Sequence, residues 1–256
     1  MAEKIVAVKG MNDLLPDEAA KWEWVEDKAR RLLARWGYRN LRTPIVEPTA
    51  LFVRGIGEAT DIVEKEMFSW QDAMNGDRLT LRPEATAGIV RAINEHNALY
   101  NGPLRIWQMG PMFRHERPQK GRYRQFHQVN YEALGSENPI LDAEAVVLLY
   151  ECLKELGLRR LKVKLSSVGD PEDRARYNAY LREVLSPHRE ALSEDSKERL
   201  ELNPMRILDS KSERDQALLK ELGVRPMLDF LGEEARAHLK EVERHLERLS
   251  VPYELE

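Results

Sequence analysis

The 256-residue sequence has a single cysteine, Cys152, so no disulfide can form within the chain. This favours a reducing compartment, and we expect a cytoplasmic protein. Cys152 lies in an apolar helical run, where a buried thiol is expected rather than a nucleophile. The six histidines are scattered, and no Cys/His spacing of a zinc site occurs. We therefore predict that the protein residues hold no metal.

Two other features are missing. No segment approaches 18 consecutive apolar residues, and the opening MAEKIVAVKGMNDLLP has no apolar signal core, so we expect no membrane anchor. The net charge is −4, from 40 basic and 44 acidic residues. Proteins that coat nucleic acid are usually basic overall. A polyanionic partner would therefore have to be bound by a local basic patch.

The order of the predicted elements indicates an α+β fold. Periodicity and turn residues predict helices and strands over these ranges: helices 17–36, 85–96 and 142–156; strands 67–70, 78–82, 104–114, 125–134 and 161–169. From residue 169 to 252 the sequence predicts helices almost alone, which suggests a helical appendage or insertion. The last residues, 253–256, resemble the start of another strand.

The loop between the two longest predicted strands is strongly basic. It reads GPMFRHERPQKGRYRQFHQ with its flanks and carries five cations against one acid: Arg114, Arg117, Lys120, Arg122 and Arg124 against Glu116. A solvated loop would explain such a run. However, Arg114 follows the apolar run WQMGPMF, and an arginine that starts in the interior favours bidentate phosphate binding. Phe126 offers a stacking face for a base.

Two further segments carry candidate ligand-binding groups. In TLRPEATAG, Glu84 and Thr86 open a helix after a strand and could hold an ammonium group, although capping of that helix explains them equally well. In HQVNYEALG, Gln128, Asn130 and Glu132 alternate on one strand face. That face either meets water or, if it is concave, reads a polar ligand.

Together these segments resemble a known family. FRHERPQKGRYRQFHQ is similar to motif 2 of class II aminoacyl-tRNA synthetases, and GYRNLRTPIVEPTALF to motif 1 with Pro44 as its proline. TLRPEATAG, KGMNDLLP and NPMRILDSK resemble segments of histidyl-tRNA synthetases. The chain is thus identified as a member of that family, of bacterial type. The resemblance implies an antiparallel sheet flanked by helices, with a catalytic core at 1–168, a helical insertion at 169–252, and a return to the core at 253–256.

The family resemblance implies ATP-dependent activation of L-histidine to histidyl-adenylate and transfer to tRNA(His), with Mg²⁺. The implied ATP-binding residues are Arg114, which also acts in catalysis, Glu116, Arg122 and Phe126. The implied histidine-binding residues are Glu84, Ala85, Thr86, Gln128 and Glu132. The implied contacts to the tRNA acceptor end are Arg117, Gln119, Lys120 and Arg124. A homodimer through the motif 1 region is also implied.

The sequence departs from the family pattern in two ways. Ala85 stands where the family commonly has glycine, which would be awkward if its φ were positive. The family's motif 3, with a second arginine for ATP, and its anticodon-binding domain do not occur in the sequence. We therefore expect an N-terminal fragment that is nearly inactive alone.

Two alternatives belong to related classes. One is the synthetase-like regulatory subunit of ATP phosphoribosyltransferase, which would not need Arg114, Glu116, Arg122 and Phe126 together. The other is a prolyl or threonyl synthetase, which is disfavoured by Gln128, Glu132 and the lack of zinc ligands. The complete motif 2 loop favours the histidyl enzyme.

Overall fold

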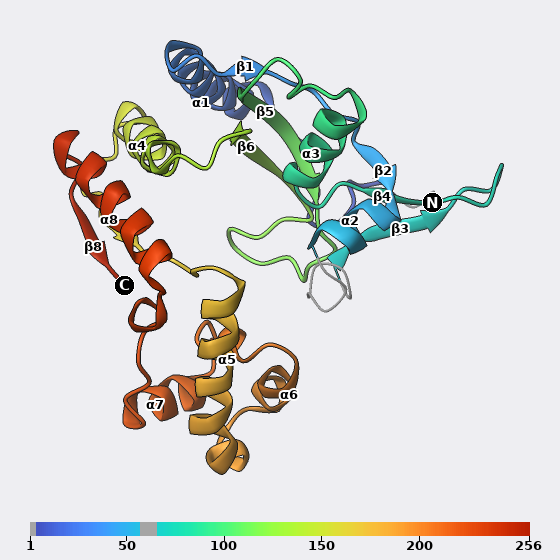
Figure 1. Cartoon of the computed structure of the whole chain (residues 1–256). Coiled ribbons are helices and arrows are strands. Elements are labelled where there is room, and N and C mark those ends of the chain that lie inside the picture. The colour runs from blue at the N-terminus through green and yellow to red at the C-terminus, as the bar shows by residue number, and fades with distance from the viewer. Residues whose placement is uncertain (1–3, 57–65) are drawn as a thin grey trace. The chain divides into compact units, whose positions relative to one another are not determined.

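The computed structural model describes residues 4–56 and 66–256 (Figure 1). The chain divides into two compact units, residues 1–137 with 151–158, and residues 138–150 with 159–256. Within the described ranges, no helix combines the length and the apolar composition that crossing a membrane requires.

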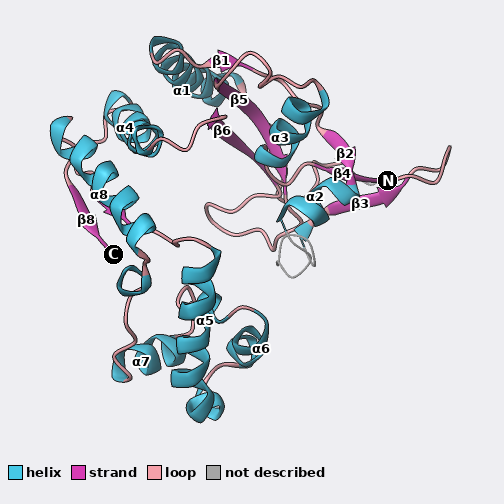
Figure 2. Ribbon diagram, viewed as in Figure 1, coloured by secondary structure: helices cyan, strands magenta, loops and turns pink. Residues whose placement is uncertain are grey.

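The first unit contains two three-stranded sheets (Figure 2). One has the order β1-β5-β6, formed by β1 (Arg39–Asn40), β5 (Leu104–Phe113) and β6 (Gln125–Leu134). The other has the order β2-β4-β3, formed by β2 (Val46–Pro48), β4 (Arg78–Leu81) and β3 (Phe68–Gln71). Pro48 lies on an edge strand, as expected of a residue without a backbone N–H.

The β5–β6 hairpin positions the candidate site. Its strands pair antiparallel along their whole length, from Leu104 opposite Leu134 to Phe113 opposite Gln125. Side chains directly opposite each other lie on the same face of a sheet. The even-numbered residues of β6 therefore share one face with the even-numbered residues of β5.

Helices cover both faces of this hairpin. Helix α1 (Pro16–Arg35) meets the odd-numbered face, where the Trp22 and His127 ring centroids are 4.7 Å apart. The chain leaves α1 through Gly37, whose φ of +77° suits glycine. Helix α3 (Thr86–Glu95) meets the even-numbered face through a buried apolar cluster formed by Ala85, Ile89, Ile93, Ile106 and Met112. Helix α2 (Thr49–Ile56) precedes the residues that are not described.

The second unit is mostly helical. Its helices are part of α4 (Pro139–Glu155), α5 (Pro171–Leu185), α6 (Glu194–Leu202), α7 (Glu213–Glu221) and α8 (Glu233–Arg248). Short 3₁₀ turns lie at Ser186–Ala191, Pro204–Ile207 and Met227–Phe230. The strands β7 (Val163–Leu165) and β8 (Tyr253–Leu255) pair in parallel. Its apolar core is built on α5, with Tyr177, Leu181 and Leu185 almost fully buried.

The predicted helices and strands are confirmed with small shifts at their ends, except that the strand predicted over 161–169 is limited to Val163–Leu165. Helix α4 begins earlier than the apolar pattern indicates, because the Asn138 side chain accepts a 3.0 Å hydrogen bond from the Ile140 amide. Helix α5 begins with a capping box between Asp170 and Asp173. The borders predicted at 168/169 and 252/253 stay predictions.

Candidate active site

The basic loop, residues 114–124, continues the β5–β6 hairpin as a narrow arm. The Arg114 amide donates to the Arg124 carbonyl at 2.9 Å, and Gln119 and Arg122 exchange two backbone hydrogen bonds. Gly121 takes a φ of +81° in the turn between them. The Gly10 carbonyl accepts from the Arg124 amide at 2.8 Å, so the N-terminal segment braces the arm.

Arg114 begins at the base of this arm and turns toward the segment before α3. Its Nε donates to the Pro83 carbonyl at 3.1 Å, and its guanidinium carbon lies 5.1 Å from the centroid of the Phe126 ring. Within the described part of the chain, neither terminal nitrogen of Arg114 donates a hydrogen bond, since its side-chain hydrogen bond uses Nε. They are thus available to a planar or tetrahedral anion.

Glu116 and Arg122 are held together. Arg122 Nη1 lies 3.0 Å from Glu116 Oε2, with 46% of the Arg122 side chain and 17% of the Glu116 side chain exposed. The family resemblance implies that Glu116 faces the adenine of ATP and that Arg122 reaches its distal phosphates. The structure pairs the two residues with each other, so ATP binding in that arrangement would require the pair to separate.

The residues assigned to the tRNA acceptor end do not share one environment. Arg117, Gln119 and Lys120 are exposed toward the tip of the arm. Arg124 is only partly exposed, and its Nε donates to the Glu116 carbonyl at 3.1 Å. Arg124 therefore braces the arm from within.

The polar face of β6 meets the first turn of α3. Thr86 Oγ1 donates to Glu132 Oε1 at 2.8 Å, and Asn130 Nδ2 lies 3.5 Å from Thr86 Oγ1. The side-chain oxygens of Gln128 and Asn130 are both buried and have no hydrogen-bond partner among the described residues. Because buried acceptors are costly to leave unpaired, this face favours a ligand that brings hydrogen-bond donors.

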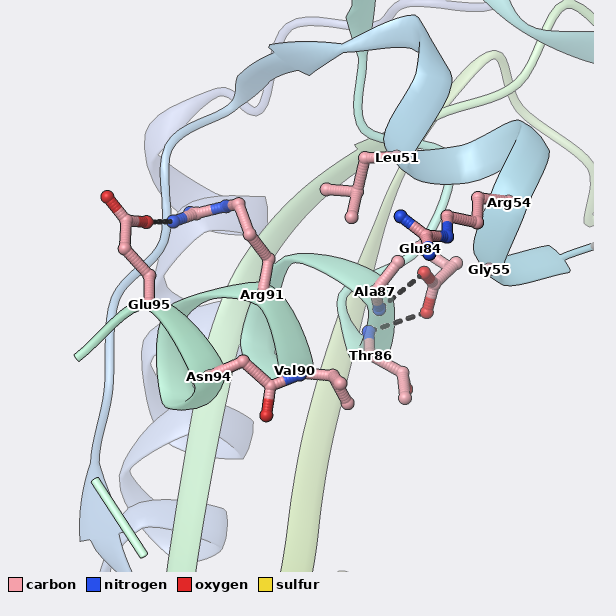
Figure 3. A pocket seen from close by; sticks show the side chains of 10 residues that line it. All are labelled: Leu51, Arg54, Gly55, Glu84, Thr86, Ala87, Val90, Arg91, Asn94 and Glu95. Atoms are coloured by element: carbon pink, nitrogen blue, oxygen red, sulfur yellow. Dashed lines mark hydrogen bonds and ion pairs between the residues drawn. The ribbon is translucent and has the colours of Figure 1, made fainter. Parts of the chain in front are cut away.

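Glu84 lies directly before the first turn of α3. Its carboxylate accepts from the Thr86 amide at 2.5 Å and from the Ala87 amide at 2.8 Å, and so caps α3 (Figure 3). The capping alternative is thus realised for Glu84, while the Thr86 hydroxyl faces Glu132. Ala85 has φ −96° and ψ −32°, a conformation open to any L-residue, so alanine in place of glycine introduces no strain.

A cavity of about 1040 Å³ opens beside α2 and α3, and both Glu84 and Thr86 line it (Figure 3). Arg91 also lines it, but its guanidinium is bound to the carboxylates of Glu47 and Glu95. Thr86 therefore links this cavity to the polar face of β6.

The electrostatics of the Glu132 site suit a cation. Burial raises the pKa of Glu132, the hydrogen bond from Thr86 lowers it, the nearby Glu84 charge raises it, and the net shift is upward. A positively charged donor at this site would stabilise the ionised carboxylate. An ammonium group, with three N–H donors and a positive charge, matches both the charge and the unpaired acceptors.

Asn130 lies on the same strand face as Gln128 and Glu132, although the family resemblance assigns it no role. Its alternation with Gln128 and Glu132 was the available signal, since residues two apart on a strand share a face. The Pro83 carbonyl was also missed. No sequence pattern marks a backbone acceptor for a distant arginine.

Comparison with known proteins places this geometry in context. The profile of the histidyl-tRNA synthetase family matches residues 10–253. The chain is 77% identical to the histidine–tRNA ligase of Thermus thermophilus over 251 residues, which covers 98% of this chain and 59% of that protein. The chain thus spans about 59% of the length of such curated relatives.

Two solved structures have a similar fold. Apo histidyl-tRNA synthetase of S. aureus aligns with a TM-score of 0.74 at 33% identity, covering 99% of this chain and 57% of that one. The second structure is a Bacillus halodurans protein described as an ATP phosphoribosyltransferase regulatory subunit/histidyl-tRNA synthetase. It aligns with a TM-score of 0.69 at 22% identity, covering 100% of this chain and 69% of that one, and so shares the fold.

The antiparallel hairpin, its basic arm and the flanking helices define a class II aminoacyl-tRNA synthetase fold. Within that class, the chain belongs to the histidyl-tRNA synthetase family.

Proposed function

We propose that this chain takes part in the ATP-dependent activation of L-histidine to histidyl-adenylate and in its transfer to tRNA(His). One observation carries the proposal. The unpaired buried oxygens of Gln128 and Asn130 lie on the strand face where Thr86 meets Glu132, and Arg114 begins where the same hairpin ends. An acceptor-rich site for an ammonium group thus adjoins a cation with free donors.

The histidine ammonium group is assigned to the face formed by Thr86, Gln128 and Glu132. Glu84 contributes negative charge from its capping position, and Ala85 shapes the backbone between Glu84 and Thr86. The buried Glu132 carboxylate needs a positive partner to ionise at low cost, which the substrate would supply. This assignment predicts weak binding of histidine analogues without the amino group.

ATP is assigned to the base of the basic arm. The terminal nitrogens of Arg114 would bind the α-phosphate, Phe126 would stack on the adenine, Glu116 would face the adenine, and Arg122 would reach the distal phosphates. The described residues gather no group of three His, Cys, Asp or Glu side chains for a metal. This fits a Mg²⁺ ion held chiefly by phosphate oxygens and water, which would offset phosphate charge.

The proposed reaction requires no nucleophile from the protein. The histidine carboxylate forms a bond to the α-phosphorus, the bond to the bridging oxygen breaks, and pyrophosphate leaves. Arg114 stabilises the charge that develops on the α-phosphoryl oxygens. The other binding residues hold histidine and ATP in line for the reaction.

Four further assignments complete the proposal. Arg117, Gln119, Lys120 and Arg124 are assigned to contact with the acceptor end, supported by the exposure of the first three. A homodimer through the motif 1 region and a cytoplasmic location are part of the same proposal. The domain borders remain 1–168 for the catalytic core, 169–252 for the insertion and 253–256 for the return.

The deciding experiment is amino-acid-dependent ATP–pyrophosphate exchange. The complete reading frame that encodes this chain and the 256-residue chain would be assayed side by side against each amino acid. The protein encoded by the complete reading frame, the complete product, should catalyse exchange with histidine alone. The 256-residue chain should show a near-background rate. No exchange with any amino acid from a folded complete product would instead favour the regulatory-subunit function.

A further inference from the structure

Arg82 lies at the point where the two sheets of the first unit meet. Its backbone amide donates to the Ile45 carbonyl at 2.9 Å, and its carbonyl accepts from the Phe113 amide at 3.0 Å. Only 5% of the residue is exposed. The end of β4 is thus tied on one side to the chain before β2 and on the other to the end of β5.

The Arg82 side chain connects the same two regions as its backbone does, the chain before β2 and the end of β5. Its Nε donates to the Pro111 carbonyl at 3.0 Å, and its Nη1 donates to the Thr43 carbonyl at 3.1 Å. The fork geometry of a guanidinium allows one side chain to serve carbonyls in two separate segments. A lysine ammonium cannot reproduce this arrangement, because it is a point charge on a flexible stem.

A glycine makes room for this guanidinium. A Cβ atom on Gly110 would lie 2.8 Å from Arg82 Nη2. Gly110 is directly opposite Gln128, so the space it leaves is on the face that carries the candidate histidine-binding residues. Arg82 therefore packs directly against the strand that supports the site.

The residue after Arg82 supplies the anchor for Arg114. The Pro83 carbonyl accepts the 3.1 Å hydrogen bond from Arg114 Nε, and Glu84, the next residue, caps α3. We propose that Arg82 is a positioning residue, an inference that rests on the proposed function. Arg82 fixes the Pro83 carbonyl and hence the direction of the Arg114 guanidinium during adenylate formation. Arg82 acts through its neighbours and does not touch the substrates.

The test compares Arg82→Lys and Arg82→Gln with the unaltered complete product in pyrophosphate exchange. We expect kcat to fall about 100-fold in both, because small displacements of catalytic groups have effects of this size. The KM for ATP should change by less than about threefold, since the lost stabilisation belongs to the transition state. Retention of kcat by Arg82→Lys would overturn the inference, because charge alone would then suffice.

Thr80→Val is the matched control for a loss of stability that does not affect the reaction. Thr80 lies on the same strand, is fully buried, and shares hydroxyl hydrogen bonds with Thr49 and Ser69. Its replacement should lower Tm without the fall in kcat. If the Arg82 variants lose no more activity than Thr80→Val at an equal loss of Tm, Arg82 is structural only.

Gly110→Ala tests the same contact without changing Arg82. It should also lower kcat, because the new methyl group displaces Arg82 Nη2, and the φ of +159° at Gly110 adds backbone strain that thermal denaturation would measure. Hydrogen exchange on the 256-residue chain separates this inference from the proposed function. Arg82→Lys should accelerate exchange at the amides of Phe113 and Arg114 but not at Ile106, whether or not the complete product is active. Unchanged exchange at those two amides would contradict the positioning role.

Discussion

The Thr86 hydroxyl donates a 2.8 Å hydrogen bond to the Glu132 carboxylate and so joins the first turn of α3 to β6. The bond fixes one oxygen of a partly buried acid on the face that also carries Gln128 and Asn130. It also leaves the Thr86 oxygen as an acceptor toward the Asn130 amide nitrogen. The polar face is therefore organised before any ligand arrives.

Replacing Thr86 tests this arrangement. Thr86→Val removes the donor to Glu132, and we expect the KM for histidine to rise about tenfold, since a hydrogen bond to a charged group contributes about 1.5–3 kcal/mol. Thr86→Ser keeps the hydroxyl and should stay close to the parent. Both would be measured by pyrophosphate exchange with the complete product. Equal values for the two variants would show that the hydroxyl is not used.

The raised pKa of Glu132 predicts a conflict between stability and binding. A carboxyl group whose pKa is higher in the folded chain than in the unfolded chain favours folding at low pH, and this contribution is lost as pH rises through the folded value. Glu132→Gln should therefore raise Tm at about pH 7, with no gain at about pH 4. The same variant should lose histidine-dependent exchange.

Glu84→Gln provides the contrast for Glu132→Gln. Glu84 caps α3 through two backbone amides, so weakening its acceptor should lower Tm at neutral pH. Thermal denaturation of both variants across the pH range separates the two roles. A lower Tm for Glu132→Gln at neutral pH would contradict the assignment of Glu132 as a ligand-binding acid.

The ion pair between Glu116 and Arg122 predicts that this arm changes partners when ATP binds. Arg122→Ala should raise the KM for ATP about tenfold, because charge-assisted contacts to phosphate are lost. Its effect on Tm should be small, since exposed ion pairs contribute little to stability. Kinetics and thermal denaturation of the complete product would measure both.

Arg244→Ala is the control for Arg122→Ala. Arg244 forms a comparable exposed ion pair with Glu241 in the second unit. It should leave both the KM for ATP and Tm nearly unchanged. If Arg122→Ala instead lowers Tm strongly and leaves the KM for ATP intact, the pair serves only to stabilise the arm.

The parts of the site that depend on local geometry could be predicted from the sequence. Strand alternation placed Gln128, Asn130 and Glu132 on one face, and this follows from the two-residue period of a strand. Apolar periodicity likewise placed α1 and α3 correctly. In each case neighbouring residues determine the outcome.

The remaining features depend on contacts between distant segments. No local pattern shows that Thr86 reaches Glu132 or that the Arg82 guanidinium reaches the Thr43 carbonyl. The sequence of the basic arm, with five cations against one acid, does not show that its turn brings Arg122 back to Glu116 and pairs the two. The role of Glu84 stayed open for a related reason, because a carboxylate at a helix start can serve either the amides or a ligand.

The second unit offers a prediction that does not depend on the proposed function. Asp215, fully buried, accepts hydrogen bonds from the hydroxyls of Ser193, Ser196 and Ser210 and from the Ser193 amide. Burial acts to raise the pKa of Asp215, but these hydrogen bonds outweigh it and lower the pKa from 3.8 to about 2. The folded chain therefore holds this proton more weakly than the unfolded chain.

The lowered pKa makes the second unit sensitive to acid. Its stabilisation is fully present above the unfolded value and is lost as pH falls through the folded value, for a total of about 2 kcal/mol between about pH 5 and below pH 2. Asp215→Asn should cost about 3 kcal/mol at neutral pH, because the hydroxyls of the buried Ser196 and Ser210 and of the half-buried Ser193 lose a charged acceptor. The measurement is hydrogen exchange of the α7 amides across the acid range.

Asp209→Asn is the control, because Asp209 is an exposed acid in the same unit, and it should leave α7 protection unchanged. If Asp215→Asn leaves α7 protection at the parent level at neutral pH, these hydrogen bonds do not stabilise the helical unit.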